Sequence, residues 1–385
     1  MTIHIEGSIS PGLELVEQEF RKNFEEEGEL GASLTIYRKG EKIVDLWGGL
    51  ADEGTGDKWE RDTLCGFYST GKPLAALGLL RLIDQGVINL ETPVAEVWPD
   101  FASNGKHRIT FRQILCHQAG LSAVKRRLPE GAMFNWDLMV SELAAQSPWW
   151  EPGSRHVYHT NTFGYLVGEP VRILTGLMPG QYLQNEITGP LNEEVYFGVP
   201  TEKMNQVATL KWEGGGQTAD TSFMDSPMSD EERMLRYAHL NPSGFSSMGV
   251  FNTFEWRKAQ IPSTNGHGTA RGVAHIYSLL ACGGSHDSFQ LLSADMLEEA
   301  SSLQSSGFCP SLQREVDFGL GFQLTRPDRP LGPNKGSFGH FGTGGSLGFA
   351  DPEAGVGFGY VMNRIKPRWQ NARNRALVDA LYQCF

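Results

Sequence analysis

The sequence has few cysteines, and their positions follow no recognisable pairing pattern. Only five of the 385 residues are cysteine, and no two of them form a C-x-x-C motif. An odd number of widely spaced cysteines supports neither a disulfide framework nor a zinc site. We therefore expect reduced thiols and a cytoplasmic location.

Long apolar runs and an excess of positive charge are also missing. No segment approaches the length of a membrane span, and the N-terminus lacks a basic stretch followed by an apolar one. The formal net charge is −12, whereas a nucleic-acid or anionic-membrane surface needs a basic patch. We expect no nucleic-acid partner and no membrane partner. A small-molecule substrate fits better, and the oligomeric state is left open.

Motifs for metals and nucleotide cofactors are absent from the sequence. The histidines show no H-E-x-x-H spacing, and no G-x-G-x-x-G opens a helix after a strand. The sequence therefore predicts neither a metal site nor a cofactor.

Strand patterns lie near both ends of the chain, and helical patterns fill its middle. Alternating residues predict a hairpin at 32–38 and 42–47, and further strands at 318–325, 346–350 and 356–363. Terminal helices are expected from Pro11 to Gly28 and over residues 368–382.

This order of elements favours an α/β (α+β) fold with one antiparallel sheet assembled from both termini and flanked by helices. We place an α/β domain at residues 1–71 and 270–385. A mostly helical domain would occupy 72–269, with the active site in the cleft between the two.

A candidate nucleophile lies where an extended stretch meets a helical pattern. Ser69-Thr70-Gly71-Lys72 has the S-x-x-K spacing, in which the lysine faces the serine across one helical turn and, if neutral, can take its proton. Free N–H groups at a helix entrance can also hold an oxyanion. On these residues alone, a helix-capping Ser69 and a solvated Lys72 remain the simpler interpretation.

Tyr158 is a candidate proton carrier. It follows a Pro-Gly turn at 152–153 and precedes a helical pattern that begins near Phe163. To act as a base, its pKa must be lowered by a neighbouring cation such as a lysine ammonium. Without such a partner, it is a half-buried structural tyrosine.

A glycine-rich segment near the C-terminus could supply the rest of a site. His340, Phe341, Gly342 and Thr343 precede a strand pattern, and glycine there permits close approach of a ligand. The amide of Thr343 could pair with that of Ser69 as an oxyanion hole. A plain glycine turn between strands is the alternative.

Taken in order, the three motifs resemble those of the family VIII carboxylesterases, which are esterases on the class C β-lactamase fold. The resemblance extends over nearly the whole chain, including residues 115–121 and 271–284. It implies a β-lactamase-like fold in which Ser69 is acylated while Lys72 and Tyr158 share the base and acid roles. The amides of Ser69 and Thr343 would bind the oxyanion. The implied substrate-binding residues are His340, Phe341 and Gly342.

Two departures from the β-lactamase pattern bear on the substrate. Tyr-x-Asn is replaced by Tyr158-His159-Thr160, with Asn161 one place late, and Lys-Thr-Gly is replaced by the segment that begins at His340. The missing lysine would attract the carboxylate of a lactam. We therefore expect small or short-chain uncharged esters, with His340 keeping a hydrogen-bond donor whose charge depends on pH.

Other interpretations remain open. Residues 344–348 match G-x-S-x-G, but His340 is the last histidine, so the order Ser–acid–His cannot be completed and Ser346 is expected to be structural. A β-lactamase, a D-amino-acid peptidase or an acyltransferase would use the same residues. A non-catalytic acyl-ligand sensor or assembly subunit is the alternative of another class.

Overall fold

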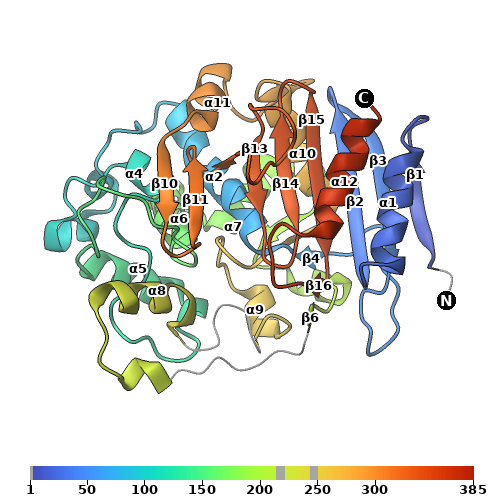
Figure 1. The fold of residues 1–385 in the computed structure, drawn as a ribbon. Coiled ribbons are helices and arrows are strands. Elements are labelled where there is room, and N and C mark those ends of the chain that lie inside the picture. The colour runs from blue at the N-terminus through green and yellow to red at the C-terminus, as the bar shows by residue number, and fades with distance from the viewer. Residues whose placement is uncertain (1–2, 214–221, 243–249) are drawn as a thin grey trace.

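The computed structural model describes residues 3–213, 222–242 and 250–385 (Figure 1). Within these residues, nine strands form one sheet in the order β1-β3-β2-β15-β14-β13-β12-β11-β10, and all neighbouring strands are antiparallel. The sheet assembled from both chain ends is thereby confirmed. Its strands are β1 (Ile5–Ile9), β2 (Gly31–Arg38), β3 (Glu41–Gly49), β10 (Ser305–Cys309), β11 (Arg314–Phe318), β12 (Gln323–Leu324), β13 (Phe338–Phe341), β14 (Leu347–Asp351) and β15 (Val356–Met362).

The two ends of the chain meet at the centre of the sheet, where β2 pairs with β15. The register runs from Arg38 opposite Val356 to Ala32 opposite Met362. Every residue of β15 is buried, because helices cover both faces. Gly357 and Gly359 lie against the backbone of α10 (Ala270–Ala281), where a Cβ would come within 2.3 to 2.4 Å of main-chain atoms. Glycine thus lets this helix seat directly on the sheet.

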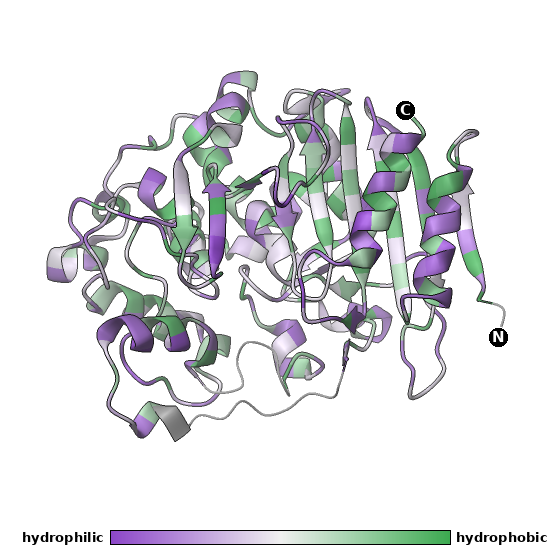
Figure 2. Ribbon diagram, viewed as in Figure 1, coloured by the Kyte–Doolittle hydropathy of each residue, from purple (hydrophilic) through white to green (hydrophobic). Residues whose placement is uncertain are grey.

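The helices divide between the two faces of the sheet and the remaining, mostly helical part of the chain. Figure 1 shows α1 and α12 side by side across one face, with α10 behind the sheet. Figure 2 shows hydrophobic strands at the centre of the sheet and mixed hydrophilic and hydrophobic residues along α1 and α12. The helices are α1 (Glu14–Glu25), α2 (Lys72–Asp84), α3 (Val94–Val97), α4 (Phe111–Leu115), α5 (Trp136–Ala145), α6 (Phe163–Thr175), α7 (Pro179–Leu183), α8 (Asp230–Leu240), α9 (Phe254–Lys258), α10, α11 (Ala294–Ser301) and α12 (Ala372–Gln383).

Short strands outside the large sheet form smaller pairings. β4 (Cys65–Gly66) pairs with β7 (Gly266–Gly268), which also pairs with β5 (Val195–Phe197). The other pairs are β6 (Lys211–Trp212) with β16 (Arg364–Ile365), and β8 (Ser285–His286) with β9 (Phe289–Gln290). β4 leads directly into the predicted nucleophile.

Several element boundaries differ from the sequence predictions. The first helix begins at Glu14 rather than Pro11, and α12 begins after Asn371, whose side chain caps it, rather than at residue 368. The single strand expected over 318–325 is two strands, because the amide of Gly319 bonds to the carbonyl of Phe322 and closes a tight turn. β1, β10 and β13 were not predicted, and β11 begins at Arg314, four residues before the strand that was expected.

Two further observations concern the whole described chain. No helix among the described residues is both long enough and apolar enough to cross a membrane. All five cysteines are free thiols.

Candidate active site

Ser69 lies in a short 3-10 turn, η1 (Tyr68–Gly71), that leads directly into α2. Tyr68, the residue before it, has a φ of +51°, a left-handed conformation that bulky residues rarely adopt. This turn buries Ser69 to 4% exposure at the N-terminal end of α2. The predicted placement of the serine at a helix entrance is thus what the structure has.

Lys72, the first residue of α2, faces Ser69 as the i+3 spacing predicts. Its Nζ lies 3.2 Å from Oγ of Ser69, 2.7 Å from the carbonyl oxygen of Thr160 and 2.9 Å from that of Ser263. The side chain is fully buried, and this desolvation holds the pKa of Lys72 well below its usual range. The solvated lysine of the simpler interpretation is therefore wrong.

Tyr158 reaches the same point from the loop that precedes α6. Nζ of Lys72 lies 4.6 Å from the centre of its ring. Burial raises the pKa of the Tyr158 hydroxyl, and a hydrogen bond to Ser69 opposes only part of that effect. This direction is opposite to what the tyrosine would need to act as a base, so Tyr158 is a protonated phenol at neutral pH.

His340, on β13, completes this group from the sheet side. Its Nδ1 lies within hydrogen-bond distance of the carbonyl oxygen of Phe341, and its Nε2 lies 3.4 Å from the hydroxyl of Tyr158. Burial, together with the nearby Lys72, holds the pKa of His340 well below its usual range. A neutral imidazole that donates from Nδ1 must accept at Nε2. The N–H donor expected at His340 therefore bonds to the carbonyl of Phe341. The other ring nitrogen, Nε2, can accept a hydrogen bond from the hydroxyl of Tyr158.

The predicted oxyanion segment packs directly on η1. A Cβ at Gly342 would come within 2.3 Å of the carbonyl oxygen of Phe67 and 2.8 Å of Oγ1 of Thr70, so only glycine fits there. The next residue, Thr343, is half-buried. In the described part of the chain, neither the amide of Ser69 nor that of Thr343 donates a hydrogen bond to a backbone carbonyl.

The hydroxyl of Ser346, the serine of the G-x-S-x-G match, has two hydrogen-bond partners. Its Oγ donates to the carbonyl oxygen of Phe67 at 2.8 Å and lies 3.1 Å from Oγ1 of Thr70. The hydroxyl ties the strand β14 to the turn that carries Ser69, which agrees with the structural role expected for it.

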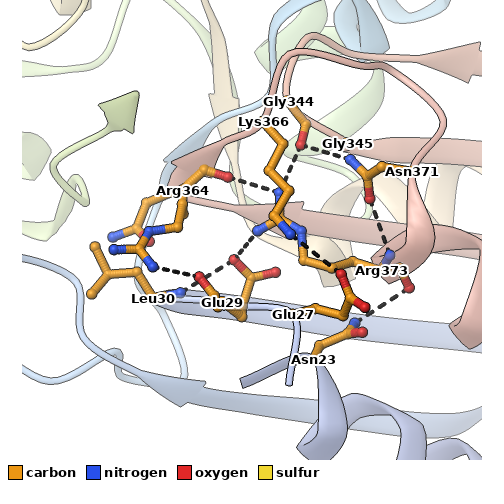
Figure 3. Close-up of polar contacts among 12 residues, drawn as sticks. Asn23, Glu27, Glu29, Leu30, Gly344, Gly345, Arg364, Lys366, Asn371 and Arg373 are labelled. Carbon is orange, nitrogen blue, oxygen red and sulfur yellow. Dashed lines mark hydrogen bonds and ion pairs between the residues drawn. The ribbon is translucent and has the colours of Figure 1, made fainter. Parts of the chain in front are cut away.

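The N-terminal end of α12 fixes the loop that contains Thr343 (Figure 3). Nη2 of Arg373 donates to the carbonyl oxygen of Gly344 at 2.8 Å, and Nδ2 of Asn374 donates to that of Gly345 at 2.9 Å. Arg373 also forms an ion pair with Glu29, and both side chains are fully buried. Residues from both ends of the chain therefore hold this loop in place.

The structure thus brings Ser69, Lys72, Tyr158 and His340 together and packs Gly342 against the turn that carries Ser69. The ring of Phe341 is buried in the core instead. Asn161 is engaged elsewhere, since it donates to the carbonyl of Ala238 and accepts from Thr264.

Sequence reasoning missed the two carbonyl groups that hold Lys72, those of Thr160 and Ser263. A backbone acceptor has no residue-type signature, so no sequence signal could have found them. It also missed His117, which has a φ of +64° and whose ring centre lies 5.0 Å from that of Tyr158. Over residues 3–213, 222–242 and 250–385, no three His, Cys, Asp or Glu side chains are grouped so as to hold a metal ion.

Comparison with known proteins places this geometry in a family. The β-lactamase family pattern matches residues 16–383. The esterase/β-lactamase LipL of Mycobacterium tuberculosis is 32% identical over 372 residues, which span 93% of this chain and 83% of that protein.

Solved structures agree with the sequence relatives. A family VIII carboxylesterase is 35% identical with a TM-score of 0.91, and the match covers 100% of both chains. A penicillin-binding protein homologue from Caulobacter crescentus is also 35% identical, with a TM-score of 0.90 over 99% of this chain and 100% of that one. The chain therefore belongs to the β-lactamase family, as a serine hydrolase related to the family VIII carboxylesterases.

Proposed function

We propose that this protein is a serine carboxylesterase that hydrolyses small carboxylic esters through an acyl-enzyme on Ser69. The observation that carries the proposal is the environment of Lys72. A neutral amine has two N–H donors and one lone pair. The carbonyls of Thr160 and Ser263 take the two donors, so the lone pair is free to accept the proton of Ser69.

In this mechanism Oγ of Ser69 attacks the ester carbonyl carbon while its proton passes to Nζ of Lys72. The amides of Ser69 and Thr343 hold the oxyanion of the tetrahedral intermediate. The intermediate collapses, the bond to the alcohol oxygen breaks, and the alcohol leaves with a proton from the Lys72–Tyr158 pair. Water then attacks the acyl-serine in the same way and releases the acid.

The pKa directions support an order for the two proton carriers. Burial lowers the pKa of Lys72 and raises that of Tyr158, so the lysine is the base and the phenol the acid. His340 accepts from the Tyr158 hydroxyl and acts as a positioning residue for it. We assign substrate contact in this segment to the backbone of Phe341 and Gly342, since the phenyl ring is buried.

The nucleophile and base come from the start of α2, the tyrosine from the loop before α6, and the oxyanion segment from the sheet. This convergence supports an active-site cleft between a helical domain at 72–269 and an α/β domain formed by 1–71 and 270–385. That division stays a prediction, as does the cytoplasmic location.

Covalent labelling tests the proposed nucleophile. Incubation with a fluorophosphonate, followed by peptide mass spectrometry, should place one adduct on Ser69. The Ser69→Ala variant should carry no adduct and should lose at least about a thousandfold in p-nitrophenyl butyrate turnover. The matched control is Ser346→Ala, in which Ser69 should still be labelled.

Full turnover by the Ser69→Ala variant would contradict the assignment, and absence of any adduct on wild-type protein would favour a non-catalytic ligand sensor. Hydrolysis rates for an ester, nitrocefin and a D-amino-acid amide separate the esterase from a β-lactamase or peptidase. Addition of a competing alcohol reveals any acyl transfer.

A further inference from the structure

A cavity of about 570 Å³ lies on the Tyr158 side of the candidate active site. Trp369 and Leu312 line it. The ring centres of Trp369 and Tyr158 are 5.5 Å apart, and Leu312 packs against the apolar cluster that contains Tyr158. A third lining residue, Ser311, has its Oγ 3.5 Å from the carbonyl oxygen of Tyr158. One layer of side chains therefore separates the cavity from the proton carrier.

The charge of this cavity is of one sign. Arg314, Arg329 and Arg368 line it, and the described residues that line it include no aspartate or glutamate. The acid nearest in sequence, Asp328, accepts from Nε of Arg326 at 3.0 Å and attracts Arg314 and Arg329 from outside the lining of the cavity. Three guanidinium groups therefore face one space with no carboxylate in its wall.

Several buried N–H groups of these arginines also lack hydrogen-bond partners. Nε and Nη2 of Arg314 and Nε of Arg329 are buried, and none has a hydrogen-bond partner among the described residues. Burial, and then repulsion from Arg314, lowers the pKa of Arg329 to about 10. Buried N–H groups without hydrogen-bond partners destabilise the folded state, so those of Arg314 and Arg329, with the exposed Arg368 beside them, are placed to bind an anion.

Aromatic rings lie against two of the three arginines. The guanidinium carbon of Arg314 lies 4.8 Å from the centre of the Trp369 ring, and that of Arg329 lies 5.8 Å from the centre of the Phe341 ring. Stacking on an aromatic face orients the planar fork that binds a carboxylate through two hydrogen bonds.

This cluster contrasts with the rest of the molecule. The chain carries a net charge of −12, and two other largely buried arginines have acidic partners, Glu29 for Arg373 and Asp62 for Arg271. A local excess of three cations in an acidic protein attracts anions to this point on the surface.

We propose that this cavity binds a carboxylate group of the substrate, so that the preferred esters are anionic. The inference rests on the proposed esterase function and names its substrate class. The expectation of an uncharged ester came from the absence of a lysine at position 340. The arginines supply positive charge from a different wall, formed by β11, the segment after β12 and the segment before α12.

Two pairs of matched substrates test the proposal and show which side of the ester carries the anion. For the acyl side, the mono-4-nitrophenyl ester of glutaric acid is compared with that of glutaramic acid. For the alcohol side, 4-acetoxybenzoate is compared with 4-acetoxybenzamide. In at least one pair we expect kcat/KM to be about tenfold higher for the carboxylate, with the preference falling as salt is added.

The variants are Arg329→Gln and Arg368→Gln, and the matched control is Arg127→Gln, which removes a surface arginine paired with Asp225. The two cavity variants should lose most of the preference for the carboxylate while hydrolysing the neutral ester at a similar rate. Arg329→Lys, which keeps the charge but not the fork, should retain part of it. The control should keep the full preference.

Failure of this inference is distinguishable from failure of the esterase assignment. Hydrolysis of the neutral esters without a carboxylate preference, or a preference that survives in both cavity variants, overturns the anion site alone. If no ester is cleaved, the esterase assignment fails, and titration calorimetry of the Ser69→Ala protein with glutarate or 4-hydroxybenzoate decides the anion site. Binding that Arg329→Gln abolishes supports the site, and no binding of either acid overturns it.

Discussion

Lys72 is the residue whose ionisation links the proposed chemistry to stability. In the unfolded chain its amine has an ordinary pKa of 10.5, whereas burial lowers it in the folded state. Below pH 10.5 the unfolded state therefore binds a proton that the folded state gives up. Folding is penalised by this difference, and the penalty grows as the pH falls from 10.5 to the folded pKa.

Replacement of Lys72 by methionine, which fills a similar volume without a charge, should remove this penalty. We expect the stability of Lys72→Met relative to wild type to increase as the pH is lowered from 10.5, by up to about 1.4 kcal/mol per pH unit, and to level off below the folded pKa. Urea denaturation at several pH values measures the difference. Esterase activity should be lost.

The exposed Lys335 supplies the control, because Lys335→Met changes no buried charge. Its stability relative to wild type should be independent of pH over the same range. A Lys72→Met curve that runs parallel to that of wild type at every pH would show that the lysine is not neutral in the folded protein.

For individual residues, the sequence could predict only those contacts that follow from local geometry along the chain. Ser69 and Lys72 meet because residues three apart share a helix face. The carbonyls that hold Lys72 belong to Thr160 and Ser263, and no residue type identifies a backbone acceptor. The three cavity arginines come from separate segments, so only the tertiary structure brings them together.

Among the elements, α12 has the most direct effect on the site, because its first turn holds the oxyanion loop. Nδ2 of Asn374 donates both to the carbonyl of Gly345 and to that of Trp369, at 2.9 and 2.8 Å. One buried amide thus joins the loop of Thr343 to the segment that lines the cavity.

Asn374→Ala should therefore reduce catalysis as well as stability. We expect a loss of about 3 kcal/mol in unfolding free energy, since the buried carbonyls lose their donors. Displacement of the Thr343 amide should lower kcat about tenfold with little change in KM. Urea denaturation and steady-state kinetics on p-nitrophenyl butyrate measure the two effects.

Asn23→Ala is the matched control, because the buried Nδ2 of Asn23 donates to the carbonyl of Arg373 in the same helix and contacts neither Gly345 nor Trp369 in any described hydrogen bond. It should lose stability while kcat stays near the wild-type value. An equal fall of kcat in both variants would mean that general loosening of α12, and not the position of the loop, sets the rate.

The elements themselves were predictable where the pattern was strong. The hairpin of β2 and β3 and the strand β15 follow from residue alternation and a clear turn. The split between β11 and β12 depends on a hydrogen bond of Gly319, and β1 is an edge strand with a largely exposed sequence. Such features arise from tertiary pairing, which local patterns do not encode.

For the whole molecule, the decisive feature is that strands from opposite ends of the chain pair with each other inside the same sheet. β2 and β15 contribute seven paired positions at its centre, and α1 and α12 pack together across one face. Ser69, Lys72 and Tyr158 precede residue 200, whereas His340 and Thr343 follow it. Neither half of the chain contains a complete core or a complete site.

A break in the exposed segment between Asp225 and Ser226 should therefore give two fragments that fold only together. Each of the fragments 1–225 and 226–385, expressed alone, should lack a cooperative unfolding transition, because its strands have no central partner to pair with. Mixed in denaturant and diluted together, they should recover a cooperative transition and p-nitrophenyl ester turnover. Recovery should depend on the concentration of both fragments, as expected for an association reaction.

Circular dichroism melts and activity titrations make the comparison. The control is fragment 1–225 mixed with a 226–385 fragment that carries Arg373→Met. That mixture should recover little activity, since the substitution leaves Glu29 buried without its partner. A cooperative transition in either fragment alone would show that one end of the chain can form a stable sheet without the other.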